Sequence, residues 1–192
     1  MLKILFIFGT RPEAIKLAPV FLECKKSKIL KPILCTTGQH KEMLDQVLNL
    51  FDLKPDYYLN VMQTNQTLSE LSSNIINKID PIFKKVQPDC IVVQGDTSTT
   101  FFASLVAFYH KIPIAHVEAG LRTNDKYQPF PEEINRRLTS QMADFHFAPT
   151  KKAKDALISE GFSRKNIWIT GNTVIDALMV INKKIQKDLR WQ

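Results

Sequence analysis

The stretch Lys3-Ile4-Leu5-Phe6-Ile7-Phe8-Gly9-Thr10-Arg11-Pro12-Glu13 decides the fold class of this chain. Its apolar run ends at a glycine and leads directly into a helix start, which is typical of the first strand and helix of an α/β protein. Thr10 and Glu13 have the spacing of a helix-capping pair, and proline is tolerated in the first turn of a helix. Apolar residues then recur at helical spacing, which predicts a helix with one face on a sheet.

The alternation of short apolar runs and longer helical patterns continues along the 192-residue chain. It predicts strands near residues 2–8, 31–37, 89–94, 112–117, 144–148 and 166–170, with a weaker strand near 57–60. It predicts helices near residues 11–26, 40–51, 67–86, 97–110, 132–142, 151–160 and 173–189. This order is typical of an α/β fold with a parallel sheet, whose loops after the strands gather along one edge and bind ligands there. The one long irregular segment, residues 120–131, has a length that is usually functional or disordered.

The composition excludes several classes of protein. A length of 192 residues fits one domain, and 44% hydrophobic against 23% charged residues is ordinary for a globular chain rather than a disordered or fibrous one. The apolar runs are far shorter than the roughly 18–20 residues of a membrane-spanning helix, and no cleavage site follows the first run. We therefore expect a cytoplasmic protein without membrane contact. Cys24, Cys35 and Cys90 have neither disulfide-framework nor zinc-motif spacing.

The chain is basic, with 26 lysines and arginines against 19 acidic residues and a formal net charge of +7. Basic clusters at residues 25–31, 151–154 and 183–190 are either solvated surface or contacts for a polyanion. They lack the interleaved aromatic residues of single-strand binders and match no nucleic-acid motif, so we expect no nucleic-acid partner. A small phosphorylated ligand would suit the charge equally well.

The first loop offers a plausible anion site. Gly9-Thr10-Arg11 combines a helix N-terminus, whose N–H groups are free, with a guanidinium. A capped helix with an exposed arginine explains the same residues without a ligand. No dinucleotide fingerprint or P-loop is present in the sequence.

Acidic residues follow several of the other predicted strands. Asp96 comes after the strand at 89–94, while His116 and Glu118, two residues apart, would project to the same side of an extended segment. Glu132 begins a predicted helix. Taken singly, each is more often a structural residue, such as a helix cap, than a catalytic one.

Taken together, these residues converge on one edge of the sheet. Crowded carboxylates raise one another's pKa and a nearby cation lowers it, so Asp96, Glu118 and Glu132 can divide into proton donor and acceptor near neutral pH. The sequence contains no nucleophile elbow and no metal-ligand spacing. These patterns favour acid–base chemistry without a metal or cofactor.

The same residues carry a resemblance to a known family, the non-hydrolysing UDP-N-acetylglucosamine 2-epimerases. The matching motifs are Phe8-Gly9-Thr10-Arg11-Pro12-Glu13-Ala14-Ile15-Lys16, Gln39-His40 with Met43-Leu44-Asp45-Gln46, Gly95-Asp96-Thr97, His116-Val117-Glu118-Ala119-Gly120-Leu121-Arg122, Pro131-Glu132-Glu133 with Asn135-Arg136, and Thr170-Gly171-Asn172-Thr173-Val174-Ile175-Asp176-Ala177. They run in the family's order from residue 4 to about residue 178.

The resemblance implies a Rossmann-like, doubly wound parallel sheet that forms the N-terminal half of a glycosyltransferase-B type fold. It implies an N-terminal domain over residues 1–178 and a helical, basic start of the inter-domain connection over residues 179–192. In the family the second half supplies most uridine and diphosphate contacts and a catalytic histidine. We therefore expect this chain to be a truncated half that is inactive alone.

The resemblance also implies an activity, the interconversion of UDP-N-acetylglucosamine and UDP-N-acetylmannosamine by elimination and re-addition of UDP, in cell-surface polysaccharide synthesis. By resemblance Asp96, Glu118 and Glu132 are the catalytic carboxylates, and the partners are UDP-N-acetylglucosamine or UDP and a second copy of the chain. Substrate-binding residues implied by the resemblance are Arg11, Lys16, His116, Arg122, Asn135 and Arg136.

Bacterial members of the family carry an allosteric site for a second nucleotide-sugar. Gln39, His40 and Gln66 match it, whereas Glu42 stands where a glutamine can occur and Asn65 where an arginine can. Adding an anion and losing a cation near a diphosphate is expected to weaken that site. Two alternatives stay open: a hydrolysing UDP-N-acetylglucosamine 2-epimerase, and a non-catalytic half that binds nucleotide-sugar or another subunit.

Overall fold

The fold is known from a computed structural model, which describes residues 1–38 and 41–187. Its strands are β1 (Leu2–Phe8), β2 (Leu30–Thr36), β3 (Tyr57–Tyr58), β4 (Cys90–Gln94), β5 (Ile114–Val117), β6 (Phe145–Ala148) and β7 (Ile167–Ile169). They form one parallel sheet in the order β3-β2-β1-β4-β5-β6-β7. The order changes direction between the adjacent strands β1 and β4, which is where doubly wound sheets bind their ligands.

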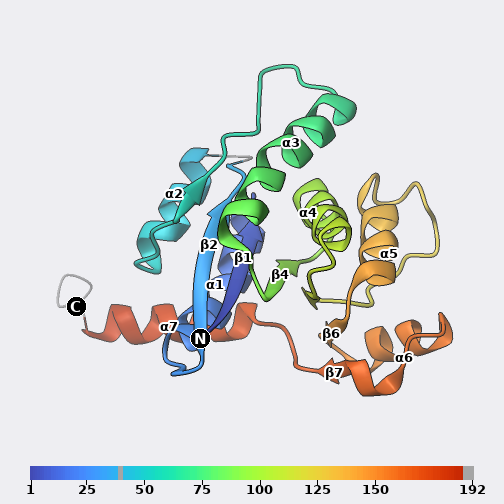
Figure 1. Cartoon of the computed structure of the whole chain (residues 1–192). Helices are drawn as coiled ribbons and strands as arrows, with labels where there is room; N and C mark the ends of the chain where they lie inside the picture. Colours follow the sequence, from blue (N-terminus) through green and yellow to red (C-terminus); the bar gives the residue numbers. More distant parts are fainter. Residues whose placement is uncertain (39–40, 188–192) are drawn as a thin grey trace.

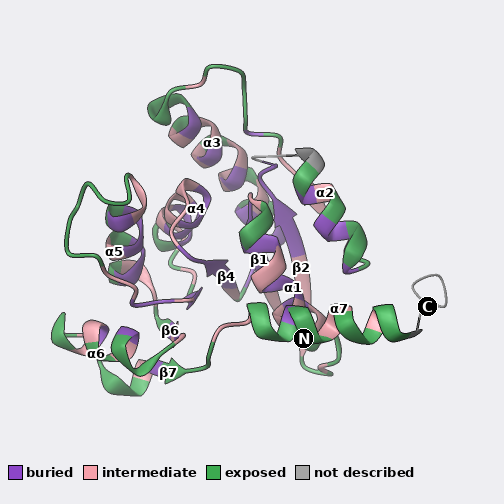
Figure 2. Cartoon of the chain, turned by 180° about the vertical axis from the view of Figure 1, so that it is seen from behind, coloured by how far each residue is buried: buried purple, intermediate pink, exposed green. Residues whose placement is uncertain are grey.

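Helices cover both faces of the sheet (Figure 1). They are α1 (Arg11–Lys25), α2 (Lys41–Leu50), α3 (Leu68–Val86), α4 (Ser98–Tyr109), α5 (Glu132–Met142), α6 (Lys151–Ser159) and α7 (Val174–Lys187), with a short 3₁₀ helix η1 (Arg164–Asn166). One apolar core lies between the sheet and α1, α2 and α7, and a second lies between the sheet and α3 and α4. Figure 2 shows the buried residues in the central strands and on the inward faces of the helices.

The chain forms these helices where its apolar spacing and its caps agree. Phe21 of α1 packs edge-to-face on Phe6 of β1, with ring centroids 5.2 Å apart. Thr97 and Thr150 cap α4 and α6 by accepting backbone N–H groups of the first turn, which would otherwise lack partners. The Thr97 cap thereby fixes the loop after β4, which lies at the point where the strand order changes.

The predicted α/β class with a parallel, Rossmann-like doubly wound sheet is confirmed, and each predicted strand and helix exists within a few residues of its expected bounds. The strand predicted as weak, β3, lies at the edge of the sheet and pairs with β2 over only two residues. The 3₁₀ helix η1 was not predicted, since three residues are too few to show a period. Residues 120–131 are irregular, as expected.

The expected domain boundary at residues 178 and 179 falls inside α7. Val180 and Ile181 of this helix pack against the same core as α1, and Lys184 donates to the Leu50 carbonyl at the end of α2 at 2.8 Å. The assignment of residues 179–192 to a connection therefore stays a prediction, and residues 188–192 lie outside the described part of the chain. Within the described ranges, no helix combines the length and the hydropathy needed to cross a membrane.

Candidate active site

Asp96 lies in the turn after β4, and the first turns of α5 hold this turn in place. The Asn135 side-chain amide donates to the Asp96 backbone carbonyl at 2.9 Å. The Arg136 Nε lies 3.4 Å from Asp96 Oδ2, and the arginine side chain is almost fully buried. The structure thus brings together three residues that the sequence predicted from two separate motifs.

The electrostatic surroundings of Asp96 place three carboxylates in one neighbourhood. Burial raises the pKa of Asp96 above its ordinary value, and the negative charges of Glu132 and Glu118 raise it further. The Arg136 and Lys16 cations act in the opposite direction. Such a cluster lets one carboxyl hold a proton while a neighbour stays ionised, which is the requirement for acid–base chemistry.

Glu118, directly after β5, has the most elaborate set of partners in the site. Its carboxylate accepts from Lys16 Nζ at 2.6 and 2.8 Å, from the Gln94 amide at 2.5 Å and from the Asn172 amide at 3.3 Å. Its backbone φ is 64°, in the left-handed region that non-glycine residues adopt at a cost of about 1–3 kcal/mol. Strain of this kind at a carboxylate held by three donors is typical of a functional residue.

His116 is fully buried in β5, two residues before Glu118. Its Nε2 lies 2.7 Å from the Gly95 carbonyl oxygen, which can only accept, so Nε2 carries the hydrogen. Burial lowers the pKa of His116 to about 4, and the imidazole is therefore neutral. The expectation that His116 and Glu118 project into one space stays a prediction, and the left-handed φ of Glu118 interrupts the extended backbone on which it rests.

The two glutamates that begin α5 have different surroundings. Glu133 is fully buried and accepts from the Thr123 and Asn124 backbone N–H groups and from Arg137 Nε at 2.9 Å. Burial acts to raise the pKa of Glu133, but these donors together lower it. Glu133 thus anchors the irregular segment, whereas Glu132 is partly exposed beside Asp96.

The anion cradle predicted after β1 is partly filled by the chain itself. The backbone N–H groups of Gly9 and Thr10 both donate to Glu13 Oε2, at 3.0 and 2.8 Å. These two donors are therefore not available to a ligand, and Arg11, exposed at the start of α1, is the remaining cation of this turn.

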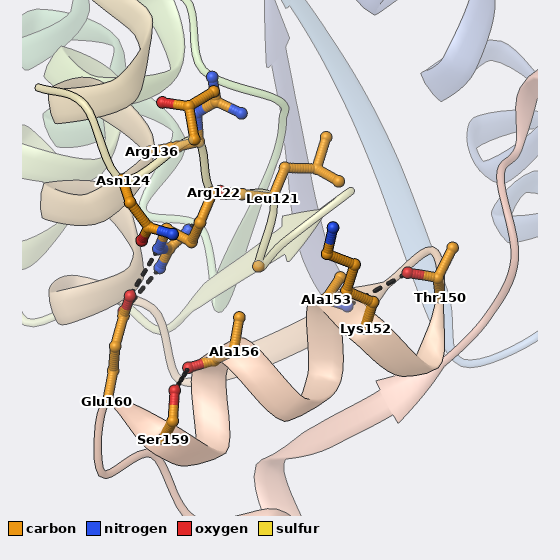
Figure 3. A pocket seen from close by; sticks show the side chains of 12 residues that line it. Leu121, Arg122, Asn124, Arg136, Thr150, Lys152, Ala153, Ala156, Ser159 and Glu160 are labelled. Carbon is orange, nitrogen blue, oxygen red and sulfur yellow. Dashed lines mark hydrogen bonds and ion pairs between the residues drawn. The ribbon is translucent and has the colours of Figure 1, made fainter. Parts of the chain in front are cut away.

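The Arg122 side chain is held by a carboxylate outside the predicted catalytic set, that of Glu160. Its Nε and Nη2 donate to the two Glu160 oxygens at 2.7 and 2.8 Å, and its side chain is 5% exposed. It lines a cavity of about 570 Å³ between the 120–124 loop and α6, in which Lys152 and Arg136 also lie (Figure 3). The contact of Arg122 with a substrate therefore stays a prediction.

The allosteric candidates are only partly described. Gln39 and His40 lie outside the described residues, and Glu42 lies in the first turn of α2. Gln66 uses its amide within its own loop, accepting from the Gln63 N–H and donating to the Val61 carbonyl, both at 3.2 Å. Asn65 has a φ of 57° in the same loop. Their role as an allosteric site stays a prediction.

Sequence reasoning missed two residues that hold the Glu118 carboxylate, Gln94 and Asn172. Gln94 is a buried polar residue at the end of an apolar strand, and that contrast was a usable signal. Asn172 lies in the turn before α7, and nothing in the sequence placed this turn beside the end of β5.

A sequence profile for UDP-N-acetylglucosamine 2-epimerase matches residues 22–192. The chain belongs to the UDP-N-acetylglucosamine 2-epimerase family. One relative in this family, the UDP-N-acetylglucosamine 2-epimerase of Neisseria meningitidis, is 55% identical over 185 residues, which are 96% of this chain and 50% of that protein. The chain spans about half the length of the curated relatives it matches.

Solved structures of the 2-epimerase family have the same fold. The crystal structure of the Neisseria meningitidis 2-epimerase bound to UDP-GlcNAc matches 98% of this chain and 54% of that one, with a TM-score of 0.90 and 52% identity. The Methanocaldococcus jannaschii 2-epimerase, in complex with UDP-GlcNAc and UDP, matches 98% of this chain and 52% of that one, with a TM-score of 0.91 and 38% identity.

Proposed function

We propose that this chain supplies the acid–base half of a UDP-N-acetylglucosamine 2-epimerase, which interconverts UDP-N-acetylglucosamine and UDP-N-acetylmannosamine. The observation that carries the proposal is the cluster of Asp96, Glu118 and Glu132 with the cations Lys16 and Arg136. Membership of the family and the UDP-GlcNAc bound to a 52% identical relative support the choice of substrate.

The chemistry of this cluster suits a proton transfer at C2 of the sugar. In the forward step a carboxylate takes the C2 proton, the C1–oxygen bond to the diphosphate breaks, and a C1–C2 double bond forms as UDP leaves. Re-addition of UDP returns a proton to C2 from the opposite face. Asp96, whose pKa burial raises, is suited to carry a proton, and Glu118 beside Lys16 is suited to act as a carboxylate.

Stabilisation of the leaving diphosphate requires positive charge and fixed donors. In this chain Arg11 and Lys16 belong to α1, the helix that follows β1 at the change of strand order, and we propose that they face the phosphates. A site built from two halves loses positioning when one half is missing, so we propose that the remaining length found in relatives completes it. With the resemblance, we also propose a cytoplasmic role in cell-surface polysaccharide synthesis.

The proposal is tested by proton NMR in deuterium oxide. UDP-N-acetylglucosamine is incubated with the chain, alone and mixed with the second half of the Neisseria meningitidis relative, and the C2 proton signal is followed. Loss of this signal together with formation of UDP-N-acetylmannosamine, both abolished by D96N and by E118Q, is the expected result.

Two other results would overturn the proposal in different ways. Accumulation of free N-acetylmannosamine and UDP would identify a hydrolysing epimerase. If the C2 proton signal persists both with the chain alone and with the two halves together, while UDP binding is retained, the chain is a binding half without catalysis.

We further propose that the protein forms a homodimer. Phe108 of α4 and Ile134 and Leu138 of the neighbouring α5 are exposed apolar side chains that a second copy could cover. Light scattering after size exclusion is expected to give twice the monomer mass, and L138E is expected to give a monomer. A wild-type monomer at high concentration would contradict this.

A further inference from the structure

We propose that Glu13 is a positioning residue of the acid–base site, because its buried carboxylate ties the turn after β1 to the start of α4. The sequence gives this residue only a capping role. The activity test of this inference rests on the proposed function. The Glu13 contacts from which we infer it belong to the folded chain and involve no substrate.

The Glu13 side chain is surrounded by donors. The Glu13 residue is 1% exposed, and its Oε2 accepts from the Gly9 N–H at 3.0 Å, the Thr10 N–H at 2.8 Å and the Thr10 hydroxyl at 2.7 Å. Its Oε1 accepts from the Thr97 hydroxyl at 2.7 Å and lies 3.2 Å from the Thr100 hydroxyl. Each oxygen thus serves a different segment of the chain.

The two segments are those that carry site residues. Thr10 precedes Arg11, and Thr97 follows Asp96, although Glu13 and Thr97 are 84 residues apart in the sequence. β1 and β4 are neighbours at the point where the strand order changes. One carboxylate therefore sets the position of the Arg11 turn relative to the Asp96 turn.

Helix capping alone does not explain this arrangement. The chain contains a second pair of the same kind, in which Glu70 Oε2 accepts from the Thr67 N–H and hydroxyl, both at 2.8 Å, at the exposed start of α3. Glu13 makes the same capping contacts but is buried, and burial of a carboxylate is unfavourable unless donors surround it. Burial also acts to raise the pKa of Glu13, while its donors lower it.

A carboxamide is a weaker partner than the carboxylate at the α4 end. The Thr97 hydroxyl accepts the Thr100 N–H and donates its hydrogen to Glu13 Oε1, so its bond to Glu13 is charge-assisted. In E13Q, the amide oxygen would be held by the Gly9 and Thr10 backbone N–H groups, which cannot rotate. The amide NH₂ would then face the Thr97 hydroxyl, and a weaker, neutral hydrogen bond of the opposite direction would replace the charge-assisted link to α4 while the capping link remained.

The test compares E13Q with the matched control E70Q in the preparation that exchanges the C2 proton. Because small displacements of catalytic groups lower rates by up to about 100-fold, we expect the kcat of E13Q to fall about 10–100-fold, with KM changed less than about 3-fold. E70Q is expected to keep wild-type kcat. Activity of folded E13Q within about 2-fold of wild type would overturn the proposal.

A second pair of variants changes the Thr97 hydroxyl, which contacts Glu13 and also caps α4. T97V removes the hydroxyl and is expected to lower kcat as E13Q does, whereas T97S keeps the hydroxyl and is expected to recover most of the loss. If E13Q does not fold, this pair decides the proposal: equal kcat in T97V and T97S would overturn it.

Amide hydrogen exchange separates this inference from the proposed function. In E13Q, but not in E70Q, the N–H groups at the start of α4 are expected to exchange at least about 10-fold faster, because the charge-assisted hydrogen bond that anchors the helix start has been lost. If wild type fails to exchange the C2 proton but this difference appears, the proposed function is wrong and the Glu13 link stands. Unchanged exchange at α4 in E13Q would overturn the link itself.

Discussion

Lys16 of α1 and Glu118 at the end of β5 are 102 residues apart in the sequence, yet Lys16 Nζ lies 2.6 Å from Glu118 Oε2. Their side chains are 22% and 13% exposed, so water only partly screens the pair. The Gln94 amide, at 2.5 Å, approaches the same Glu118 oxygen. This ion pair fixes the direction of a carboxylate whose backbone is strained, and it joins one helix layer to the end of a central strand.

K16M is expected to lower the free energy of unfolding by about 2 kcal/mol, because it leaves the mostly buried Glu118 carboxylate without its cation. E118Q removes the charge that Lys16 compensates. We therefore expect the double variant K16M/E118Q to lose less stability than the two single losses combined. Urea unfolding of the four proteins measures this coupling, and additive losses would show that the pair contributes nothing.

R136M is expected to raise the pKa of Asp96 further above its ordinary value, because the Arg136 cation lowers it in the wild type. At a given pH more of Asp96 is then protonated, so any step that needs its carboxylate moves to higher pH. Carbon NMR titration of the Asp96 carboxyl measures the shift.

R137M is the matched control for this prediction. Arg136 and Arg137 both pair with Glu133, with their Nε atoms 3.2 and 2.9 Å from its oxygens, but Arg137 is not among the charges that act on Asp96. Equal Asp96 titration curves in R136M and R137M would contradict the assignment of Arg136.

Local patterns were sufficient to predict the elements of the fold. Residues 3–13 combine an apolar run, a glycine and a helix start, and the same succession recurs along the chain. Because parallel strands put their following loops on one edge, the meeting of Asp96 with Glu118 and Glu132 followed from topology alone. Such reasoning needs only the order of elements, which the sequence contains.

The contacts that orient the site could not be predicted in this way. Asn172 reaches Glu118 because the turn before α7 passes beside the end of β5, and no local pattern carries that information. The left-handed backbone of Glu118 and the inward turn of Glu13 are likewise products of packing. The ion pair of Arg122 could not be predicted either, because its partner, Glu160, lies 38 residues away in the sequence.

His116 is expected to make the protein unstable in mild acid. Its pKa is lowered by burial to about 4 when folded, against about 6.5 when unfolded. At a pH between these two pKa values, His116 therefore binds a proton in the unfolded chain but not in the folded chain. The stability conferred by neutral His116 is complete above the unfolded pKa and falls by up to about 3 kcal/mol as the pH drops toward 4.

H116Q tests this pH dependence, because glutamine can donate to the Gly95 carbonyl but does not titrate. Urea unfolding at about pH 7 and about pH 5 is expected to give a smaller difference in H116Q than in wild type. Burial also lowers the pKa of His146, so H146Q is expected to reduce the difference as well. The same pH dependence in wild type and H116Q would exclude this role for His116.

Gly120, which lines the cavity beside α6, and Gly161, which follows α6 in the chain, provide a matched pair of substitutions. Both have a positive φ, 90° and 94°. A Cβ on Gly120 would lie 2.3 Å from the Ala153 backbone carbonyl oxygen of α6, whereas a Cβ on Gly161 would meet nothing within 4 Å. The backbone strain is therefore common to both sites, and the steric conflict with α6 belongs to Gly120 alone.

G161A is expected to lower the free energy of unfolding by about 1 kcal/mol, the cost of a left-handed alanine. G120A is expected to lower it by about 3 kcal/mol or more, because α6 must also move away from the loop that carries Arg122. Urea unfolding of both variants measures the difference. The Arg122 contact with Glu160 bridges the same two segments. The double variant G120A/R122M is therefore expected to lose less free energy of unfolding than the sum of the losses in G120A and R122M. Equal losses of unfolding free energy in G120A and G161A would mean that α6 moves away from the added Cβ at no cost. The close approach at Gly120 would then not contribute to the position of the loop.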